Sequence, residues 1–182
     1  MSAPISHTVR LATPEDVPGI LALMRELAEY EKLTGIFAAT EDSLRASLFG
    51  RTPAAECLVA ERTDAADGAA AELLAYAVWF HNYSTFLSRR GLYLEDVYVR
   101  ADMRGQGIGR ALLRRLAAIA VERGCGRFEW TVLDWNQTAI DFYEGLGAQV
   151  LPEWRIVRVT GDALEKMARQ VEAPAARADV DG

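Results

Sequence analysis

The chain has 182 residues, of which 51% are hydrophobic and 25% charged, a composition typical of a folded globular protein rather than a disordered one. Its formal net charge of −6 argues against nucleic acid as the main partner. No apolar run approaches the roughly 20 residues that span a bilayer, and the first residues lack the layout of a secretory signal. The two cysteines fit no metal or redox spacing. We therefore expect a cytoplasmic protein without a metal or a membrane partner.

The first half of the chain alternates strand-like and helix-like segments. Pro14, with acidic residues beside it, favours the start of a helix. Short apolar runs bounded by polar residues or glycines predict strands. The expected elements are a strand and a helix start within 7–16, apolar helical spacing over 20–27, a helix over 40–50 between Thr40 and Gly50, strands over 56–62, 72–80 and 91–99, and a hairpin loop over 63–70.

The second half opens with a glycine-rich turn and continues with alternating elements. We expect a helix from about 108 to 123, strands over 127–133 and 153–160, and short helices over 136–147 and 162–170. The tail, residues 171–182, is rich in Ala, Pro and Asp and is expected to be disordered. Because no repeat or linker divides the chain, we predict one α+β domain over residues 1–170, with a mixed, largely antiparallel central sheet flanked by helices.

The glycine-rich turn lies between a predicted strand and a predicted helix. Gly105, Gly107 and Gly109 occupy every second position, and the segment 100–115 holds five arginines but only one acidic residue. The spacing matches neither the P-loop nor the dinucleotide fingerprint, because no Lys–Ser or Lys–Thr follows and Arg110 stands where a glycine is required. Free amides and the positive end of a helix dipole suit a pyrophosphate. A tight turn without a ligand is the alternative, and the basic surroundings favour the anion.

The motif Arg-x-x-Gly-x-Gly after a strand resembles the coenzyme A loop of the GNAT superfamily of N-acetyltransferases. The segments "YLEDVYV", "WN…FY" and "AEYEKL" are similar to its spermidine/spermine branch, and the similarity runs from about Val9 to Met167. The resemblance implies the GNAT fold and acetyl-CoA as co-substrate, with backbone amides of residues 105–110 on the pyrophosphate and residues 97–99 along the pantetheine arm. The implied cofactor-binding residues are Val97, Tyr98, Val99, Arg104, Gly105, Gln106, Gly107, Ile108, Gly109, Arg110, Asn136 and Tyr143.

Asn136 and Tyr143 are seven residues apart, which is close to two helical turns, so both should project from one face of a helix. Asn136 also suits the N-cap position. The resemblance implies that Asn136 contacts the cofactor and that Tyr143 is the general acid. A departing CoA thiolate is better stabilised when a proton donor lies within hydrogen-bond reach. The alternative is that Asn136 only caps the helix and Tyr143 only packs.

Two acidic residues, Glu95 and Asp96, interrupt an apolar strand and should face opposite sides of the sheet unless a bulge intervenes. An amine with a pKa near 10.4 arrives protonated, so the site must attract a cation and then remove a proton. The resemblance implies that Glu95 binds substrate and relays the proton, directly or through water. It also implies substrate contacts from Tyr30, Glu31, Asp96 and Glu153. A structural salt bridge is the alternative for any of these acids.

The sequence thus predicts an N-acetyltransferase that moves an acetyl group from acetyl-CoA to a primary amine of a small cationic acceptor, a polyamine or diamine. Direct attack in a ternary complex is expected because neither cysteine lies in a recognisable nucleophile setting. Glu144, Gly145 and Leu146 follow the tyrosine where the polyamine branch tends to carry basic residues, which leaves thialysine or lysine-like amino acids and protein amines as alternative acceptors. A non-catalytic CoA sensor is a further alternative. The resemblance also implies a homodimer.

Overall fold

The computed structural model describes residues 5–63 and 72–169. The chain forms two compact units, Met1–Thr131 and Val132–Gly182. The expected tail at 171–182 and all but the first residue of the expected hairpin loop at 63–70 lie outside the described residues. The first unit carries the sheet and the helices that cover it, and the second carries two short helices.

One five-stranded sheet in the order β1-β2-β3-β4-β5 forms the centre of the first unit. The pairs β1–β2, β2–β3 and β3–β4 are antiparallel, whereas β4 and β5 run parallel from Leu92 to Leu94. The prediction of a mixed, largely antiparallel sheet is therefore confirmed. The strands are β1 (His7–Leu11), β2 (Glu56–Arg62), β3 (Leu73–Ser84), β4 (Arg89–Val99) and β5 (Phe128–Trp130).

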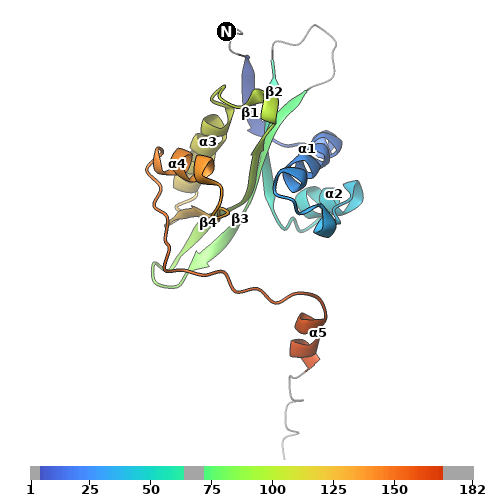
Figure 1. The fold of residues 1–182 in the computed structure, drawn as a ribbon, viewed down its shortest axis with the longest axis vertical. Coiled ribbons are helices and arrows are strands. Elements are labelled where there is room, and N and C mark those ends of the chain that lie inside the picture. Colours follow the sequence, from blue (N-terminus) through green and yellow to red (C-terminus); the bar gives the residue numbers. More distant parts are fainter. Residues whose placement is uncertain (1–4, 64–71, 170–182) are drawn as a thin grey trace, which may run out of the picture. The chain divides into compact units, whose positions relative to one another are not determined.

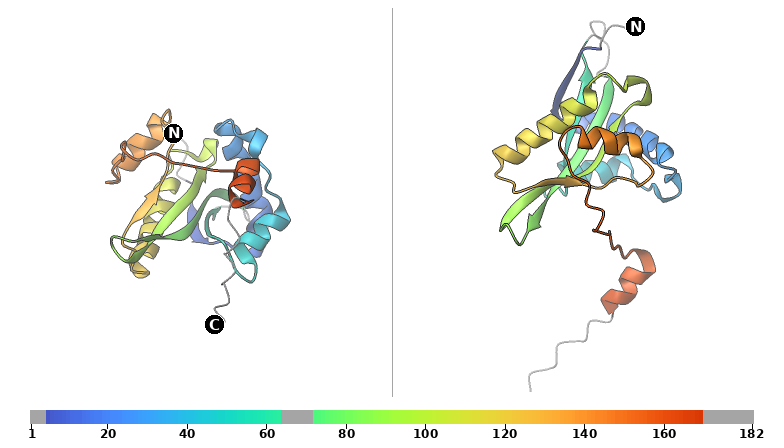
Figure 2. Two further views of the ribbon diagram at one scale, coloured as in Figure 1. Left: turned by 90° about the horizontal axis from the view of Figure 1, so that it is seen from below. Right: turned by 60° about the vertical axis from the view of Figure 1, so that its left-hand side comes forward.

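Helices cover both faces of this sheet. α1 (Val17–Tyr30) and α2 (Glu41–Phe49) lie on one face, and α3 (Ile108–Glu122) lies across the other (Figures 1 and 2). The apolar residues of α1 bury one stripe against the sheet, as their helical spacing predicts. Short 3₁₀ turns occupy η1 (Pro14–Asp16), η2 (Thr34–Ile36) and η3 (Ala101–Met103). The helices α1, α2 and α3 each start within a few residues of their predicted positions, whereas η2 and η3 were not predicted.

The caps of α2 show why the sequence located this helix so closely. The Thr40 side chain accepts a hydrogen bond from the backbone N–H of Ser43 at 3.2 Å, and the Ser43 hydroxyl accepts from the Thr40 N–H at 2.9 Å. This reciprocal pair satisfies backbone donors that a helix start otherwise leaves open. At the other end, Gly50 is the C-cap residue.

The second unit holds α4 (Gln137–Glu144) and α5 (Gly161–Arg169), and here one prediction is wrong. Residues 153–160, expected to form a strand, have no regular secondary structure and are exposed throughout. A strand needs a neighbour for its backbone hydrogen bonds, and no strand of the described residues pairs with this segment. β5 is also shorter than the strand expected over 127–133, because its ladder with β4 ends opposite Leu94.

Candidate active site

The two acidic residues of β4 lie at a β-bulge. Leu94 pairs with Trp79 and Asp96 pairs with Val78, so two consecutive residues of β3 face three residues of β4 and Glu95 is the extra one. Glu95 is exposed, whereas Asp96 is half-buried. The bulge therefore replaces the regular alternation of the strand and separates the two carboxylates into different surroundings.

Asp96 lines a pocket of about 330 Å³ on the face of the sheet that α1 covers. Two carboxyl-bearing residues, Glu31 and Asp96, line it, and Tyr76 of β3 lines it as well. The other lining residues belong to α1 and to the segment that follows it: Met24, Leu27, Ala28, Leu33, Ile36, Phe37, Ala38 and Ala39. Such a pocket suits a ligand with an aliphatic chain and a positive charge.

Burial shifts the titration of both pocket acids. It raises the pKa of Asp96 from 3.8 to about 6, and the negative charges of Glu95 and Glu31 add to the shift. Burial likewise raises the pKa of Glu31. Each carboxylate is thus held where its negative charge is unfavourable, and an ammonium group between them would relieve the unfavourable charge. Perturbed acids in a pocket are a common mark of a functional site.

Beyond the bulge, β4 leaves one edge open and leads into the glycine turn. β5 pairs with β4 only as far as Leu94, and over residues 95–99 the described chain places no strand on that side. After η3, Gly105 and Gly107 have φ values of 77° and 82°, which favour glycine, and α3 begins at Ile108. The N-cap residue of this helix is Gly107, which has no side chain with which to cap the helix start. Gly109 lies inside the first turn of α3 with an ordinary helical backbone.

The space in front of the turn fits an anionic ligand. A Cβ atom built on Gly105 or Gly107 would meet nothing within 4 Å, so the backbone of both residues borders open space. The uncapped start of a 15-residue helix supplies N–H groups and the positive end of a helix dipole at the same place. A pyrophosphate can therefore approach the backbone here without a steric obstacle.

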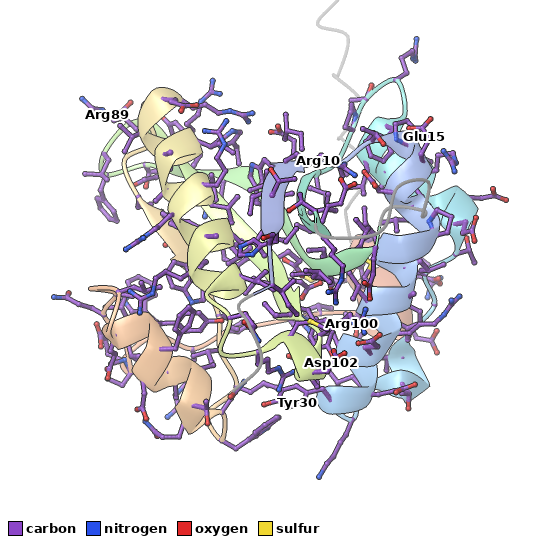
Figure 3. All side chains as sticks on the ribbon, turned by 90° about the horizontal axis from the view of Figure 1, so that it is seen from above. Arg10, Glu15, Tyr30, Arg89, Arg100 and Asp102 are labelled. Atoms are coloured by element: carbon purple, nitrogen blue, oxygen red, sulfur yellow. The ribbon has the colours of Figure 1, made fainter. Side chains whose placement is uncertain are left out.

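Arg104 connects the glycine turn to the pocket wall. Its Nε donates a hydrogen bond to the Val99 carbonyl at 3.2 Å, and its guanidinium lies 4.7 Å from the centre of the Tyr30 ring. Tyr30 ends α1 (Figure 3), and the next residue, Glu31, lines the pocket. The neighbouring Tyr98 donates its hydroxyl to Glu26 at 3.1 Å. The first residue of the loop motif thus fixes the end of α1 against β4.

The five arginines of the segment 100–115 are less available to an anion than the sequence suggests. Arg100 pairs with Asp102 at 2.8 Å, where both residues lie in and beside η3 (Figure 3), and it also pairs with Glu72. Arg115 pairs with Glu122 at 3.1 Å on the surface of α3. Part of this positive charge is therefore neutralised within the protein.

The remaining predicted site residues belong to the second unit. Asn136 is the N-cap of α4, where its side chain accepts a hydrogen bond from the Ala139 N–H at 3.3 Å, which confirms the predicted cap. Tyr143 lies in the last turn of α4, half-buried, with its ring 5.5 Å from that of Phe142. Glu153 is exposed, between α4 and α5.

One pocket residue, Tyr76, was not identified from the sequence. It stands in the apolar run "LLAYAVWF", where its hydroxyl was the only signal available. In the structure it lies at the centre of β3 and its ring is part of the core.

Among the described residues, no group of three His, Cys, Asp or Glu side chains could hold a metal ion. Within the same residues, every helix is too short or too polar to cross a bilayer.

Known proteins are similar to this chain over most of its length. A family model described as the acetyltransferase (GNAT) family matches residues 21–148. The thialysine N-epsilon-acetyltransferase of Bos taurus is 42% identical over 164 residues, which cover 88% of this chain and 96% of that protein. Spermidine/spermine N(1)-acetyltransferase-like protein 1 of Homo sapiens is 33% identical over 88% of this chain, and the match covers 23% of that protein.

A solved structure agrees with these sequence matches. An integron cassette protein from V. cholerae has a TM-score of 0.73 and 27% identity, over 91% of this chain and 99% of that one. The predictions of the GNAT fold and of an acetyl-CoA-dependent N-acetyltransferase are confirmed by the family match and the named relatives. The chain belongs to the acetyltransferase (GNAT) family.

Proposed function

We propose that this enzyme acetylates a primary amine at the end of a short aliphatic chain, in a lysine-like amino acid, a diamine or a polyamine. The observation that carries the proposal is the course of β4. Asp96 faces an apolar pocket with a second acid, and three residues later the same strand ends before the uncapped glycine turn. A site for a cation and a site for an anion therefore lie along one continuous strand.

The donor side of the site uses backbone groups. Residues 97–99 offer the open edge of β4 to the pantetheine arm, and amides of residues 105–110 face the pyrophosphate. Ile108 is buried in the core, so only its backbone serves the ligand. The Arg104 side chain stabilises the turn by its hydrogen bond to the Val99 carbonyl and does not extend toward the ligand. When bound, acetyl-CoA supplies the acetyl group as an activated thioester.

On the acceptor side, the two acidic residues of the bulge have different roles. Asp96 and Glu31 hold the ammonium group in the pocket, with Tyr30 placing the end of α1. Glu95, which is exposed, takes the proton that the amine must lose before it attacks, directly or through an ordered water. By the family resemblance, Tyr143 gives its hydroxyl proton to the leaving sulfur, Asn136 contacts the cofactor and Glu153 contacts the substrate.

Both units would belong to one domain, with the boundary of that domain near residue 170. The family match supports this, because it begins in α1 of the first unit and continues without interruption to residue 148 of the second.

Direct attack by the amine, without a covalent enzyme intermediate, is supported by the cysteines. Cys57 is buried and burial raises its pKa to about 12, far from the thiolate form that a nucleophile needs.

The identity of the acceptor is tested by a thiol-release assay with acetyl-CoA and a panel of spermidine, spermine, putrescine, thialysine, lysine and a lysine peptide. We expect turnover with the small amines, and thialysine to be the best of them, because the thialysine enzyme of Bos taurus is the more similar of the two relatives described above. Turnover with the peptide alone would favour a protein acetyltransferase. Binding of acetyl-CoA without turnover on any amine would favour a sensor.

Replacing Gly107 with alanine is expected to weaken acetyl-CoA binding far more than it weakens folding. The added Cβ meets no described atom within 4 Å, but it would occupy open space where we propose that the pyrophosphate binds, and it strains a backbone with φ of 82°, at a cost of about 1–2 kcal/mol. Gly124→Ala is the matched control, because its φ is 67° and its Cβ also meets nothing. Calorimetric titration with CoA and thermal unfolding should show similar losses of stability and a loss of affinity only for Gly107→Ala.

We further propose that the enzyme is a cytoplasmic homodimer. Both cysteines are free, which suits a reducing compartment. The second unit exposes apolar side chains at 75% for Trp154, 65% for Ile156 and 90% for Val157, more than an isolated surface segment usually carries. Pairing with a second copy of the chain would cover them. Sedimentation equilibrium should give twice the mass of 20.0 kDa, and Val157→Glu should lower that mass.

A further inference from the structure

Arg104, the first residue of the loop motif, lies close to two aromatic rings. Its guanidinium is 4.7 Å from the centre of the Tyr30 ring and 5.6 Å from that of the Tyr98 ring, while its Nε donates to the Val99 carbonyl. A guanidinium over the face of an aromatic ring is attracted to it. The resemblance implies a cofactor role for Arg104 and a separate substrate role for Tyr30, whereas the structure joins the two side chains in one contact.

The same side of α1 is attached to β4 one turn earlier. Glu26 and Tyr30 are four residues apart and therefore lie on one face of the helix. Glu26 accepts a hydrogen bond from the hydroxyl of Tyr98, a residue of β4, at 3.1 Å. Contacts at two successive turns thus fix how the last part of α1 is rotated about its own axis.

A different face of α1 lines the acceptor pocket. The lining residues on this face follow helical spacing: Met24, Leu27, Ala28 and Glu31. Because Tyr30 and Glu31 are consecutive, their side chains point about 100° apart around the helix axis. The chain that follows gives the Glu31 carboxyl little support, since Lys32 has a φ of 60° and residues 32–36 are exposed. The direction of this carboxyl therefore depends on the last turn of α1.

We propose that Tyr30 and Arg104 form one positioning unit, which sets the affinity for the acceptor amine by holding the Glu31 carboxyl in the pocket. The proposal rests on the function proposed above, because it explains how one of the two ammonium-binding acids is held. An arginine of the cofactor motif thereby acts on the acceptor. Glu31 serves the binding of the cation and not the transfer of the acetyl group, so its displacement should raise KM and change kcat little.

The test is a double-mutant cycle of Tyr30→Leu and Arg104→Met on the best small amine of the panel, at saturating acetyl-CoA. Both residues are exposed, so neither substitution empties the core. We expect KM for the amine to rise about fivefold in each single variant, as a cation–π contact is lost. The double variant should show no further rise, because both substitutions remove the same interaction. In all three variants kcat should change by less than about twofold.

A substitution at Glu31 tests the route by which the unit acts. In a Glu31→Gln background the charge that the unit positions is gone, so adding Tyr30→Leu should not raise KM further. If Tyr30 bound the amine directly, its effect would persist in this background, and the proposal would be wrong. It would also be wrong if the two single effects multiplied to about 25-fold in the double variant, because the two residues would then act independently.

Arg45→Met is the matched control for loss of an exposed arginine. Arg45 also donates a hydrogen bond to a backbone carbonyl, that of Pro14 at 2.8 Å, but it does not line the pocket. This variant should leave KM and kcat unchanged, and a comparable rise in its KM would overturn the role of the Tyr30–Arg104 pair while leaving acetyl transfer established. A natural enzyme that acetylates none of the amines would instead reject the proposed function.

Discussion

Replacing Tyr143 with phenylalanine is expected to lower kcat by about 10²–10⁴-fold, the usual contribution of a general acid or base, and to leave the affinity for acetyl-CoA unchanged. The substitution removes only the hydroxyl and keeps the ring that lies 5.5 Å from Phe142 in α4. Without the hydroxyl, the leaving sulfur must depart as a thiolate or take its proton from water. Steady-state thiol release gives kcat, and calorimetric titration with CoA gives the affinity.

A purely structural role for Tyr143 would give a different pattern. Loss of packing would lower the melting temperature and reduce kcat and CoA affinity together, whereas loss of the acid lowers kcat alone. Tyr83→Phe is the control for removal of a phenol hydroxyl, because Tyr83 is exposed, does not line the pocket and bonds Ser88 at the hairpin end of β3. An unchanged kcat in Tyr143→Phe would remove this tyrosine from the mechanism and leave water as the proton donor.

Most of the fold could be predicted because its signals are local. Thr40 and Gly50 delimit α2 through caps that involve residues within one turn. The glycine turn could likewise be placed, because positive φ values at Gly105 and Gly107 depend on the residues themselves. The segment 153–160 shows the limit of this reasoning. Its β-branched residues favour a strand, but a strand forms only where a neighbour provides hydrogen bonds.

The pocket could be predicted only in part, because it depends on how distant segments meet. The sequence named Glu31 and Asp96, but it emphasised Glu95, and the bulge that separates the two strand acids is set by the register of β4 against β3. Nothing within the segment 91–99 specifies that register. The same holds for Tyr76, because its position beside Asp96 in the pocket depends on the pairing of β3 with β4.

The bulge also creates a conflict between stability and binding at Asp96. The carboxylate that attracts the ammonium is half-buried, close to Glu95 and Glu31, and unfavourably placed until the cation arrives. Sites of this kind are commonly less stable than the fold would otherwise allow. Glu95 avoids the conflict because it is exposed, which suits a group that must exchange a proton with water. Removing the charge of Asp96 should therefore change stability and activity in opposite directions.

We expect Asp96→Asn to stabilise the folded protein at pH 8 and to lower kcat/KM for the amine by about 10–100-fold, as a charged hydrogen bond is lost. The folded pKa of about 6 exceeds the ordinary value of 3.8, so the folded state binds more protons between these values. The natural protein therefore loses stability as pH rises through this window, by up to about 3 kcal/mol at 1.36 kcal/mol per pKa unit. The variant lacks this loss, so the two proteins should differ in stability at pH 8 and much less at pH 4.

Chemical denaturation from pH 4 to pH 8, together with kcat/KM over the range where the enzyme is folded, separates this account from a general charge effect. In the natural enzyme kcat/KM should fall below about pH 6, as Asp96 takes a proton and stops attracting the cation, and the variant should lack that acidic limb. Glu29→Gln, which removes an exposed charge from α1 near Glu31, is the control and should alter neither profile. If Asp96→Asn instead destabilises the protein at pH 8, the carboxylate already has a stabilising partner, and the ammonium site lies elsewhere.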